Sequence, residues 1–177
     1  SIARCLSALR SFYKFLREHK LRSDNPVAAH KTPKLGRALP KDLSEADVEA
    51  LIHAPDINTA LGLRDRAMLE VLYACGLRVT ELLNLRLELI NLKQGYLRIV
   101  GKGNKERLVP MGQVACEWIE KYLTESRPQL YKSATDYLFL TVHGGIMSRQ
   151  NFWYAIKRYA LQAGIQAELS PHTLRHA

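Results

Sequence analysis

The sequence has few cysteines and no long apolar run, and each of these absences argues against a class of protein. Its three cysteines, Cys5, Cys75 and Cys116, are far apart and form no CxxC pair. This spacing argues against a disulfide framework or a zinc site and favours a reducing compartment such as the cytoplasm. No apolar stretch approaches the ~18 residues of a membrane span, and no signal-peptide pattern opens the chain. We therefore expect a cytoplasmic protein that is not embedded in a membrane.

Motifs for metal and nucleotide chemistry are missing as well. Aspartates and glutamates do not cluster at metal-ligand spacing, which argues against a two-metal nuclease. There is no Walker A loop, so nucleotide-driven work is not expected. The Gly-x-Gly at 101–103 does not open a helix, so it is not a dinucleotide-binding fingerprint. We expect a protein that uses no metal and no cofactor.

Positive charge is abundant, and it gathers at one end of the chain. The net charge is +9 over 177 residues. Residues 1–41 hold ten Lys and Arg against two acids, whereas residues 42–177 hold sixteen against fifteen. A basic arm joined to a nearly neutral body favours a polyanionic partner, most simply nucleic acid. An anionic membrane surface is the alternative that charge alone leaves open.

Residues 2–20 have the periodicity of an amphipathic helix, with an apolar seam at positions 2, 6, 9, 13 and 16. Arg10, Lys14 and Arg17 lie on another face, which is either solvated or bound to phosphates. We expect residues 1–22 to be the last helix of a helical domain. Residues 23–41 contain three prolines and keep the positive charge, Lys34 included, which indicates a basic linker able to follow a nucleic-acid backbone.

Residues 42–177 mix helix and strand patterns. Helix signals are the N-cap residues Ser44 and Ser148, an apolar segment over 60–75 that ends at Gly76, and a helix over 115–123 that is expected to break before Pro128. Strand signals are residues 96–100 and 107–109 around a turn, with 136–140 as the expected third strand. The fold class is therefore α+β: a mainly helical domain over 42–177 with a small antiparallel sheet.

Arg78 lies between apolar residues, so we expect it to be buried or half-buried. A buried arginine needs a partner, and Glu81, three residues further along the same short helix, is close enough to orient it. The pair is either a structural ion pair or a device that points a guanidinium at a ligand phosphate.

Further basic residues fall in positions from which they can reach a ligand. Lys102 and Lys105 lie in the glycine-flanked turn between the two expected strands, and Arg149 begins the helix after Ser148. Basic side chains in hairpin turns and at helix ends are commonly solvated and have no further role. An amine that reaches a phosphate, however, can act as a general acid. Ser170 and Pro171 can open a helix on which His172 and Arg175 share a face, and together these two side chains can bind a phosphate oxygen and hold a proton.

Four of these residues, Arg78, Lys102, His172 and Arg175, describe a site for a phosphodiester handled without metal. The three segments that contain them, GLRVTEL at 76–82, GKGNKER at 101–107 and HTLRH at 172–176, resemble the signature boxes of the tyrosine recombinase (phage-integrase-like) family. The resemblance runs along the whole chain, and three boxes in the right order are far more specific than one.

The resemblance implies a fold, a reaction and partners. Members of the family clamp double-stranded DNA between a helical domain and an α/β catalytic domain, and a tyrosine attacks the scissile phosphate to form a 3′-phosphotyrosyl link. By motif, Arg78 and Arg175 would bind the non-bridging oxygens, Lys102 would protonate the leaving 5′-oxygen, His172 would assist, and Glu81 would orient Arg78. The implied partners are a dif-like recombination site, a paralogous recombinase and a DNA translocase.

One departure from the family pattern concerns the nucleophile. The family's tyrosine follows the H-x-x-R box, whereas all eight tyrosines here precede His172. We therefore assign no nucleophile, and we expect a catalytic domain cut short at its C-terminus that binds DNA without cleaving it. The alternatives are a phage or transposon integrase, a type IB topoisomerase, and a non-catalytic DNA-binding module.

Overall fold

The structure is a computed structural model, and it describes residues 2–31, 43–100, 106–166 and 169. Five residues singled out above lie outside this part of the chain: Lys34, Lys102, Lys105, His172 and Arg175. The chain divides into two compact units, Ser1–Leu39 and Pro40–Ala177, and each is described here by itself.

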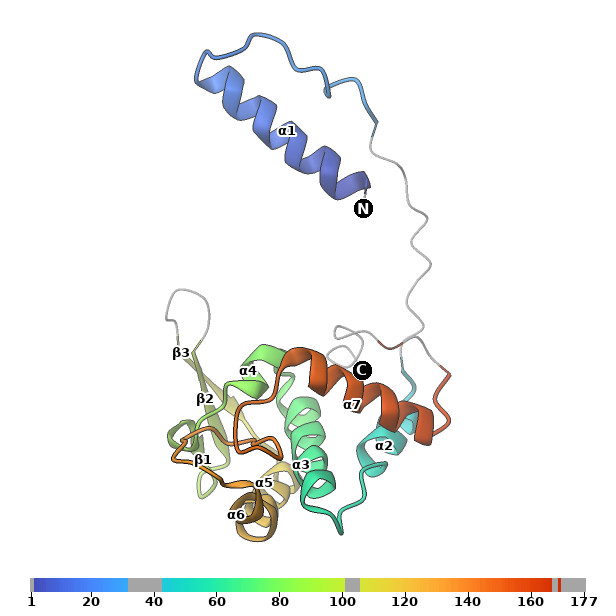
Figure 1. Ribbon diagram of the computed structural model, residues 1–177, viewed down its shortest axis with the longest axis vertical. Helices are drawn as coiled ribbons and strands as arrows, with labels where there is room; N and C mark the ends of the chain where they lie inside the picture. Colours follow the sequence, from blue (N-terminus) through green and yellow to red (C-terminus); the bar gives the residue numbers. More distant parts are fainter. Residues whose placement is uncertain (1, 32–42, 101–105, 167–168, 170–177) are drawn as a thin grey trace. The chain divides into compact units, whose positions relative to one another are not determined.

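The first unit contains α1, which spans Ile2–Glu18 (Figure 1). The helix expected from the sequence is thus confirmed, and it ends where Lys20 adopts a left-handed backbone with φ +55°. The chain after it turns back toward the helix, so that Arg10 donates a hydrogen bond to the carbonyl of His30. None of the 17 residues of α1 is buried: in its apolar seam, Ile2 and Leu9 are exposed, and the other three side chains are of intermediate exposure.

The second unit is mostly helical. Its helices are α2 (Glu45–His53), α3 (Ala60–Cys75), α4 (Val79–Leu83), α5 (Gln113–Lys121), α6 (Arg127–Leu130) and α7 (Arg149–Gln162), with a 3₁₀ turn at Leu87–Leu89. The predicted caps are confirmed: the hydroxyls of Ser44 and Ser148 accept from the backbone N–H groups three residues on, and Gly76 closes α3 with φ +55°.

The helix over 115–123 does not stop before Pro128 as expected. It continues from α5 through a π-helical turn, Tyr122–Ser126, directly into α6. Proline is tolerated because it lies in the first turn of α6, where a backbone N–H would have no acceptor within that helix.

The sheet has three antiparallel strands in the order β1 (Ile90–Asn91), β2 (Tyr96–Val100) and β3 (Glu106–Pro110). The hairpin of β2 and β3 is confirmed, with Tyr96 opposite Pro110 and Val100 opposite Glu106. The prediction of a third strand over residues 136–140 was wrong. Residues 136–140 form only isolated bridges, and three consecutive apolar side chains there, Leu138, Phe139 and Leu140, are all buried, which removes the alternation of an exposed strand.

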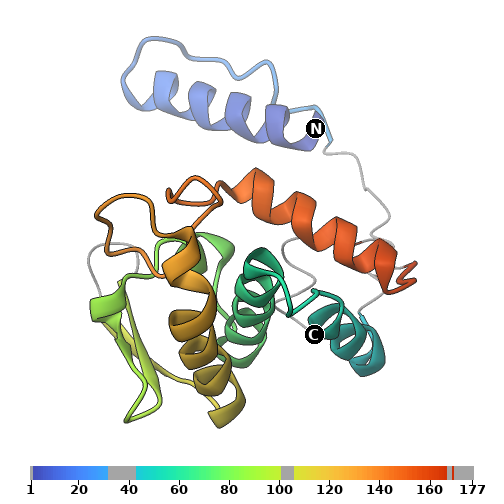
Figure 2. The ribbon, with the colours of Figure 1, turned by 60° about the horizontal axis from the view of Figure 1, so that its bottom comes forward.

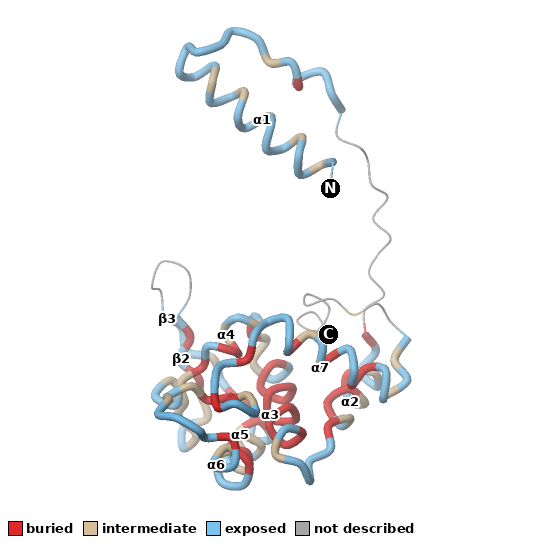
Figure 3. Tube along the Cα trace, viewed as in Figure 1, coloured by how far each residue is buried: buried red, intermediate tan, exposed pale blue. Residues whose placement is uncertain are grey.

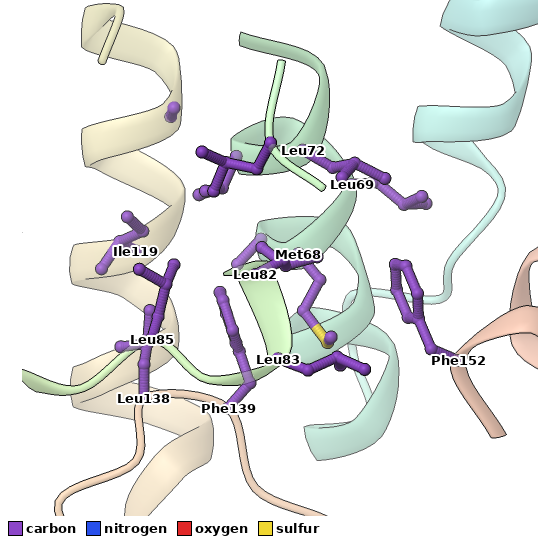
Figure 4. Close-up of a cluster of buried hydrophobic side chains, with 14 of the residues drawn as sticks. Met68, Leu69, Leu72, Leu82, Leu83, Leu85, Ile119, Leu138, Phe139 and Phe152 are labelled. Carbon is purple, nitrogen blue, oxygen red and sulfur yellow. The ribbon is translucent and has the colours of Figure 1, made fainter. Parts of the chain in front are cut away.

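Helix α3 occupies the centre of the second unit, in contact with α2, α4, α5 and α6 (Figures 1 and 2). Burial is concentrated along it (Figure 3). Met68, Leu69 and Leu72 pack against Leu82 and Leu83, which follow in the chain, and against side chains from distant segments (Figure 4). The distant segments contribute Ile119, Leu138, Phe139 and Phe152. The core therefore fixes where α3 ends and α4 begins.

Four charged residues of α3 are also buried, and each has a partner. Arg64 donates to Asp65 at 2.7 Å and to the carbonyl of Leu140 at 2.9 Å, and the hydroxyl of Tyr159 on α7 donates to Asp65 Oδ2 at 2.7 Å. Burial, and then the charge of Asp65, raises the pKa of Tyr159 to about 12. This network joins α3 to α7.

Replacing Tyr159 by phenylalanine should destabilise the protein by about 1–3 kcal/mol, because the buried carboxylate of Asp65 loses a hydrogen-bond donor. Urea unfolding measures the change. Tyr154→Phe, at an exposed tyrosine of the same helix, is the matched control and should change stability by less than about 0.5 kcal/mol. Equal stability of Tyr159→Phe and the wild type would show that the hydrogen bond from Tyr159 to Asp65 does not stabilise the fold.

Candidate active site

Arg78 is the N-cap residue of α4, and its backbone is held from both sides. Gly76 turns the chain out of α3 with a left-handed φ, which a residue with a Cβ adopts only under strain. Leu77 is 1% exposed and anchors the turn in the core. The position of the Arg78 Cα is therefore set by α3 and α4 together. Its guanidinium is free to reach outward, since 58% of the side chain is exposed.

Arg78 was expected to be buried or half-buried, but 58% of its side chain is exposed, and the more buried member of the pair is Glu81. The side chain of Glu81 is 9% exposed. One of its oxygens accepts from the backbone N–H of Arg78 at 2.8 Å, and the other accepts from Arg78 Nη1 at 2.9 Å. Of the apolar neighbours on which the expectation was based, Leu77 is buried and Val79 is of intermediate exposure, while the long side chain of Arg78 extends into solvent.

Arg107 on β3 is a third member of this cluster, and the sequence analysis did not single it out. Its Nη1 donates to Glu81 Oε1 at 3.1 Å and its Nη2 to Glu81 Oε2 at 2.9 Å, a two-pronged contact. The signal was present, because Arg107 ends the same GKGNKER segment as Lys102. However, nothing in the sequence pairs a strand residue with a helix residue 26 positions earlier.

The electrostatics of the cluster suit an anion. Burial alone would raise the pKa of Glu81, but the hydrogen bonds from Arg107 and Arg78 outweigh it and lower that pKa to about 2. Glu81 is thus ionised across the physiological range, and two guanidiniums around one carboxylate leave an excess positive charge. A phosphate oxygen approaching the exposed face of Arg78 meets N–H donors and this excess charge.

Arg149 lies on α7, a helix that is in contact with α4. It begins α7, directly after the cap Ser148, and it is exposed. A cavity of about 330 Å³ between the two helices is lined by Val79 of α4 and by residues of α7: Arg149, Gln150, Phe152 and Trp153. Figures 1 and 2 show the start of α7 beside α4. Of the predicted site residues, the structure thus brings together Arg78 and Glu81, with Arg149 on the adjoining helix.

The first unit has its own basic groove. Arg10, Lys14 and Arg17 of α1 line a groove of about 570 Å³ together with Glu18, Asn25 and Ala28. Lys14 lies 3.8 Å from Glu18, and both side chains are largely exposed. The three basic residues predicted to share a face therefore do so, on the side of α1 where the chain folds back.

Two other kinds of feature, a metal site and a membrane span, are absent from the described part of the chain. Across 2–31, 43–100, 106–166 and 169, no three His, Cys, Asp or Glu side chains are grouped so as to hold a metal ion. None of the helices described is both long enough and apolar enough to span a membrane.

Residues 41–177 match the model of the phage integrase family. The match covers more than half of the chain, including the whole of the Arg78 cluster. The chain belongs to the phage integrase family. The resemblance drawn from the three signature boxes is thereby confirmed, and so is the mainly helical fold with its small antiparallel sheet.

Curated relatives and solved structures agree with this assignment. The chain is 56% identical over its whole length to "Tyrosine recombinase XerD" of Pseudomonas putida and spans 60% of that protein. It is also 56% identical to the protein of the same name from Proteus mirabilis and spans 57% of it. Among solved structures, XerA recombinase superposes with a TM-score of 0.69 at 28% identity, covering 99% of this chain and 60% of that one.

The ionised state of Glu81 should make stability depend on acid pH. Its pKa is about 2 in the folded protein against 4.5 when unperturbed, so the contribution is complete above pH 4.5 and is lost as the pH falls toward 2. The pKa difference corresponds to at most about 3 kcal/mol, and to less in practice because both guanidinium partners are partly exposed.

Urea unfolding between neutral pH and pH 3 tests this expectation. Glu81→Gln should be less stable than the wild type at neutral pH, and the gap between them should narrow below pH 4.5. The matched control is Glu117→Gln, at an exposed glutamate of α5. If the gap stays constant over the whole range, the carboxylate of Glu81 does not stabilise the fold through its charge.

Proposed function

We propose that the protein is a XerD-like site-specific recombinase that cuts and rejoins DNA through a 3′-phosphotyrosyl intermediate. The observation that carries the proposal is the Arg78 cluster: an exposed guanidinium at the start of a helix, held by a buried, ionised carboxylate. This arrangement presents a fixed positive charge to a phosphodiester. The identity to proteins named XerD supports the same conclusion.

In this proposal, each residue of the signature boxes has a role in phosphoryl transfer. Arg78 and Arg175 bind the non-bridging oxygens and stabilise the pentavalent transition state. Lys102 protonates the 5′-oxygen that leaves, and His172 assists proton transfer or phosphate binding. The energy of the broken bond is kept in the covalent phosphotyrosine, so the rejoining step needs no metal and no nucleotide.

We also propose that the 177 residues alone bind DNA without cleaving it. No tyrosine follows Arg175 in this sequence. Two of those that precede it are buried, and their hydroxyls are engaged elsewhere: Tyr122 donates to the carbonyl of Leu138, and Tyr159 donates to Asp65. Burial raises the pKa of both phenols, which opposes their use as nucleophiles.

The proposed partner is double-stranded DNA carrying a dif-like site, with the paralogue XerC and the translocase FtsK as protein partners in resolving chromosome dimers at cell division, in the cytoplasm. A solved structure of XerH recombinase bound to difH DNA supports the DNA partner: it superposes with a TM-score of 0.68 at 25% identity and covers 81% of this chain and 42% of that one. Arg10, Lys14, Arg17, Lys34, Lys105 and Arg149 would contact the backbone.

An integrase of a phage or transposon is the second candidate. The integrase of mycobacterium phage Brujita superposes with a TM-score of 0.61 at 26% identity, covering 97% of this chain and 54% of that one. Its chemistry would be the same, and only the DNA site would differ. The higher identity to XerD proteins favours the first candidate.

The full-length protein should form a covalent adduct on a nicked dif-like duplex without added divalent metal. Denaturing gels with labelled DNA, in the presence of EDTA, measure the adduct. Arg78→Ala should lower adduct formation by roughly 100-fold or more, because a transition-state charge contact is lost. Lys93→Ala, at an exposed lysine of the β1–β2 turn, is the control and should leave it unchanged. If no adduct is trapped from the wild type, the recombinase proposal is wrong.

The basic groove of α1 should contribute to affinity through phosphate contacts. Replacing Lys14 and Arg17 by alanine should weaken DNA binding by the 177-residue chain and reduce the slope of log K against log [salt] by about 0.9 for each contact removed. Fluorescence anisotropy over a series of salt concentrations measures the slope, again with Lys93→Ala as the control. An unchanged slope would mean that this face is merely solvated.

A further inference from the structure

Within the cluster, Arg107 is the charged side chain that joins the sheet to α4, among the residues that the structure describes. It comes from β3, whereas Arg78 and Glu81 both belong to the start of α4. A cavity of about 290 Å³ lies beside this contact, and its lining includes Thr80 and Glu81 of α4 and Ile99 and Val100 of β2.

The four hydrogen bonds to Glu81 use both of its oxygens twice. Oε1 accepts from Arg78 Nη1 and Arg107 Nη1, and Oε2 accepts from the Arg78 backbone N–H and Arg107 Nη2. A carboxylate has about four lone-pair sites, so this one is saturated. Its terminal torsion, which is broad in a free glutamate, is thereby restricted to one orientation.

This orientation determines how much of Arg78 remains for a ligand. Without Arg107, both oxygens of Glu81 would be open to the fork of Arg78, and a two-pronged pair would turn the guanidinium toward the protein and neutralise it. With Arg107 present, only one side-chain N–H of Arg78 is bound to Glu81 among the contacts described, and 58% of the side chain faces outward. Arg107 also balances the charge of Glu81, which leaves that of Arg78 to act on an anion.

The exposure of Arg107 limits how much this contact adds to the stability of the fold. Arg107 is 41% exposed, and ion pairs at such positions contribute about 0–1 kcal/mol. Helix α4 and strand β2 are already anchored in the core by Leu82, Leu97 and Ile99, which are at most 3% exposed. An exposed guanidinium that fully occupies a buried carboxylate is more useful for orienting a neighbour than for holding the two elements together.

We propose that Arg107 is a positioning residue for the scissile phosphate: it saturates Glu81 and so presents the guanidinium of Arg78 to the DNA. This inference rests on the proposed function, because it assigns a phosphodiester as the ligand of Arg78. It adds a residue that acts through Arg78 without contacting DNA itself.

The test uses the full-length protein on the nicked dif-like duplex, at protein concentrations that saturate binding. Arg107→Ala should slow adduct formation by about 10–100-fold, as is typical for partners that orient a binding group, while the Kd for intact duplex changes by less than about threefold. Arg107→Lys keeps the charge but lacks the two-pronged geometry, so it should restore only part of the rate. The matched control is Arg86→Ala, at another exposed arginine paired with one carboxylate, Asp136, and it should leave the rate unchanged.

A double-mutant cycle separates positioning from a general structural effect. If Arg107 acts through Arg78, then adding Arg107→Ala to Arg78→Ala should slow the reaction by less than twofold further. Independent, multiplying effects in the cycle would overturn the inference, and so would an Arg107→Ala rate equal to that of the wild type. If the Arg107→Ala variant does not fold, the same double-mutant cycle with Arg107→Gln tests the inference. A wild type that forms no adduct would instead defeat the proposed function, and the inference with it.

Discussion

Burial of α3 is the constraint on which the rest of the second unit depends. Every residue from Gly62 to Leu72 is buried, so the helix cannot turn one face to water as most surface helices do. Its charged residues must therefore find partners inside the protein. They pair with one another along α3 and also reach other elements: Tyr159 of α7 bonds to Asp65, and His53 of α2 bonds to Arg66. These contacts fix the neighbouring helices around α3, and the left-handed Gly76 then places Arg78 where α3 ends.

Two of the arginine–carboxylate pairings, one within α3 and one at the start of α4, differ in how far their members are exposed. Arg64 and Asp65 are both buried, so their pairing satisfies charges that water cannot reach. At Glu81 only the carboxylate is buried, while Arg78 and Arg107 remain 58% and 41% exposed. A buried anion between two half-exposed cations leaves positive charge at the surface in a fixed direction. That arrangement adds modestly to stability, because both cations are partly exposed, and in the proposed function it presents positive charge to a phosphate.

The sequence predicted the helices well because their signals are local. Ser44, Ser148 and Gly76 mark helix ends through contacts within three or four residues, and the periodicity of residues 60–75 reports their own burial. The third strand was misplaced because residues 136–140 are as apolar as a strand but lie inside the core. The exposure of Arg78 and the contact of Arg107 with Glu81 could not be predicted for a related reason: which guanidinium reaches Glu81 depends on how β3 approaches α4, which no local pattern contains.

The uneven charge of the chain now has a physical interpretation. Residues 42–177 are nearly neutral overall, so long-range attraction to a polyanion must come mainly from the basic residues 1–41. In residues 42–177, by contrast, many of the described arginines are paired with carboxylates or carbonyls, which fixes the direction in which each guanidinium points. Attraction of this kind is screened by salt, whereas the orientation of Arg78 by a buried carboxylate is much less so. Affinity and phosphate alignment should therefore respond to salt separately, since they arise from different parts of the chain.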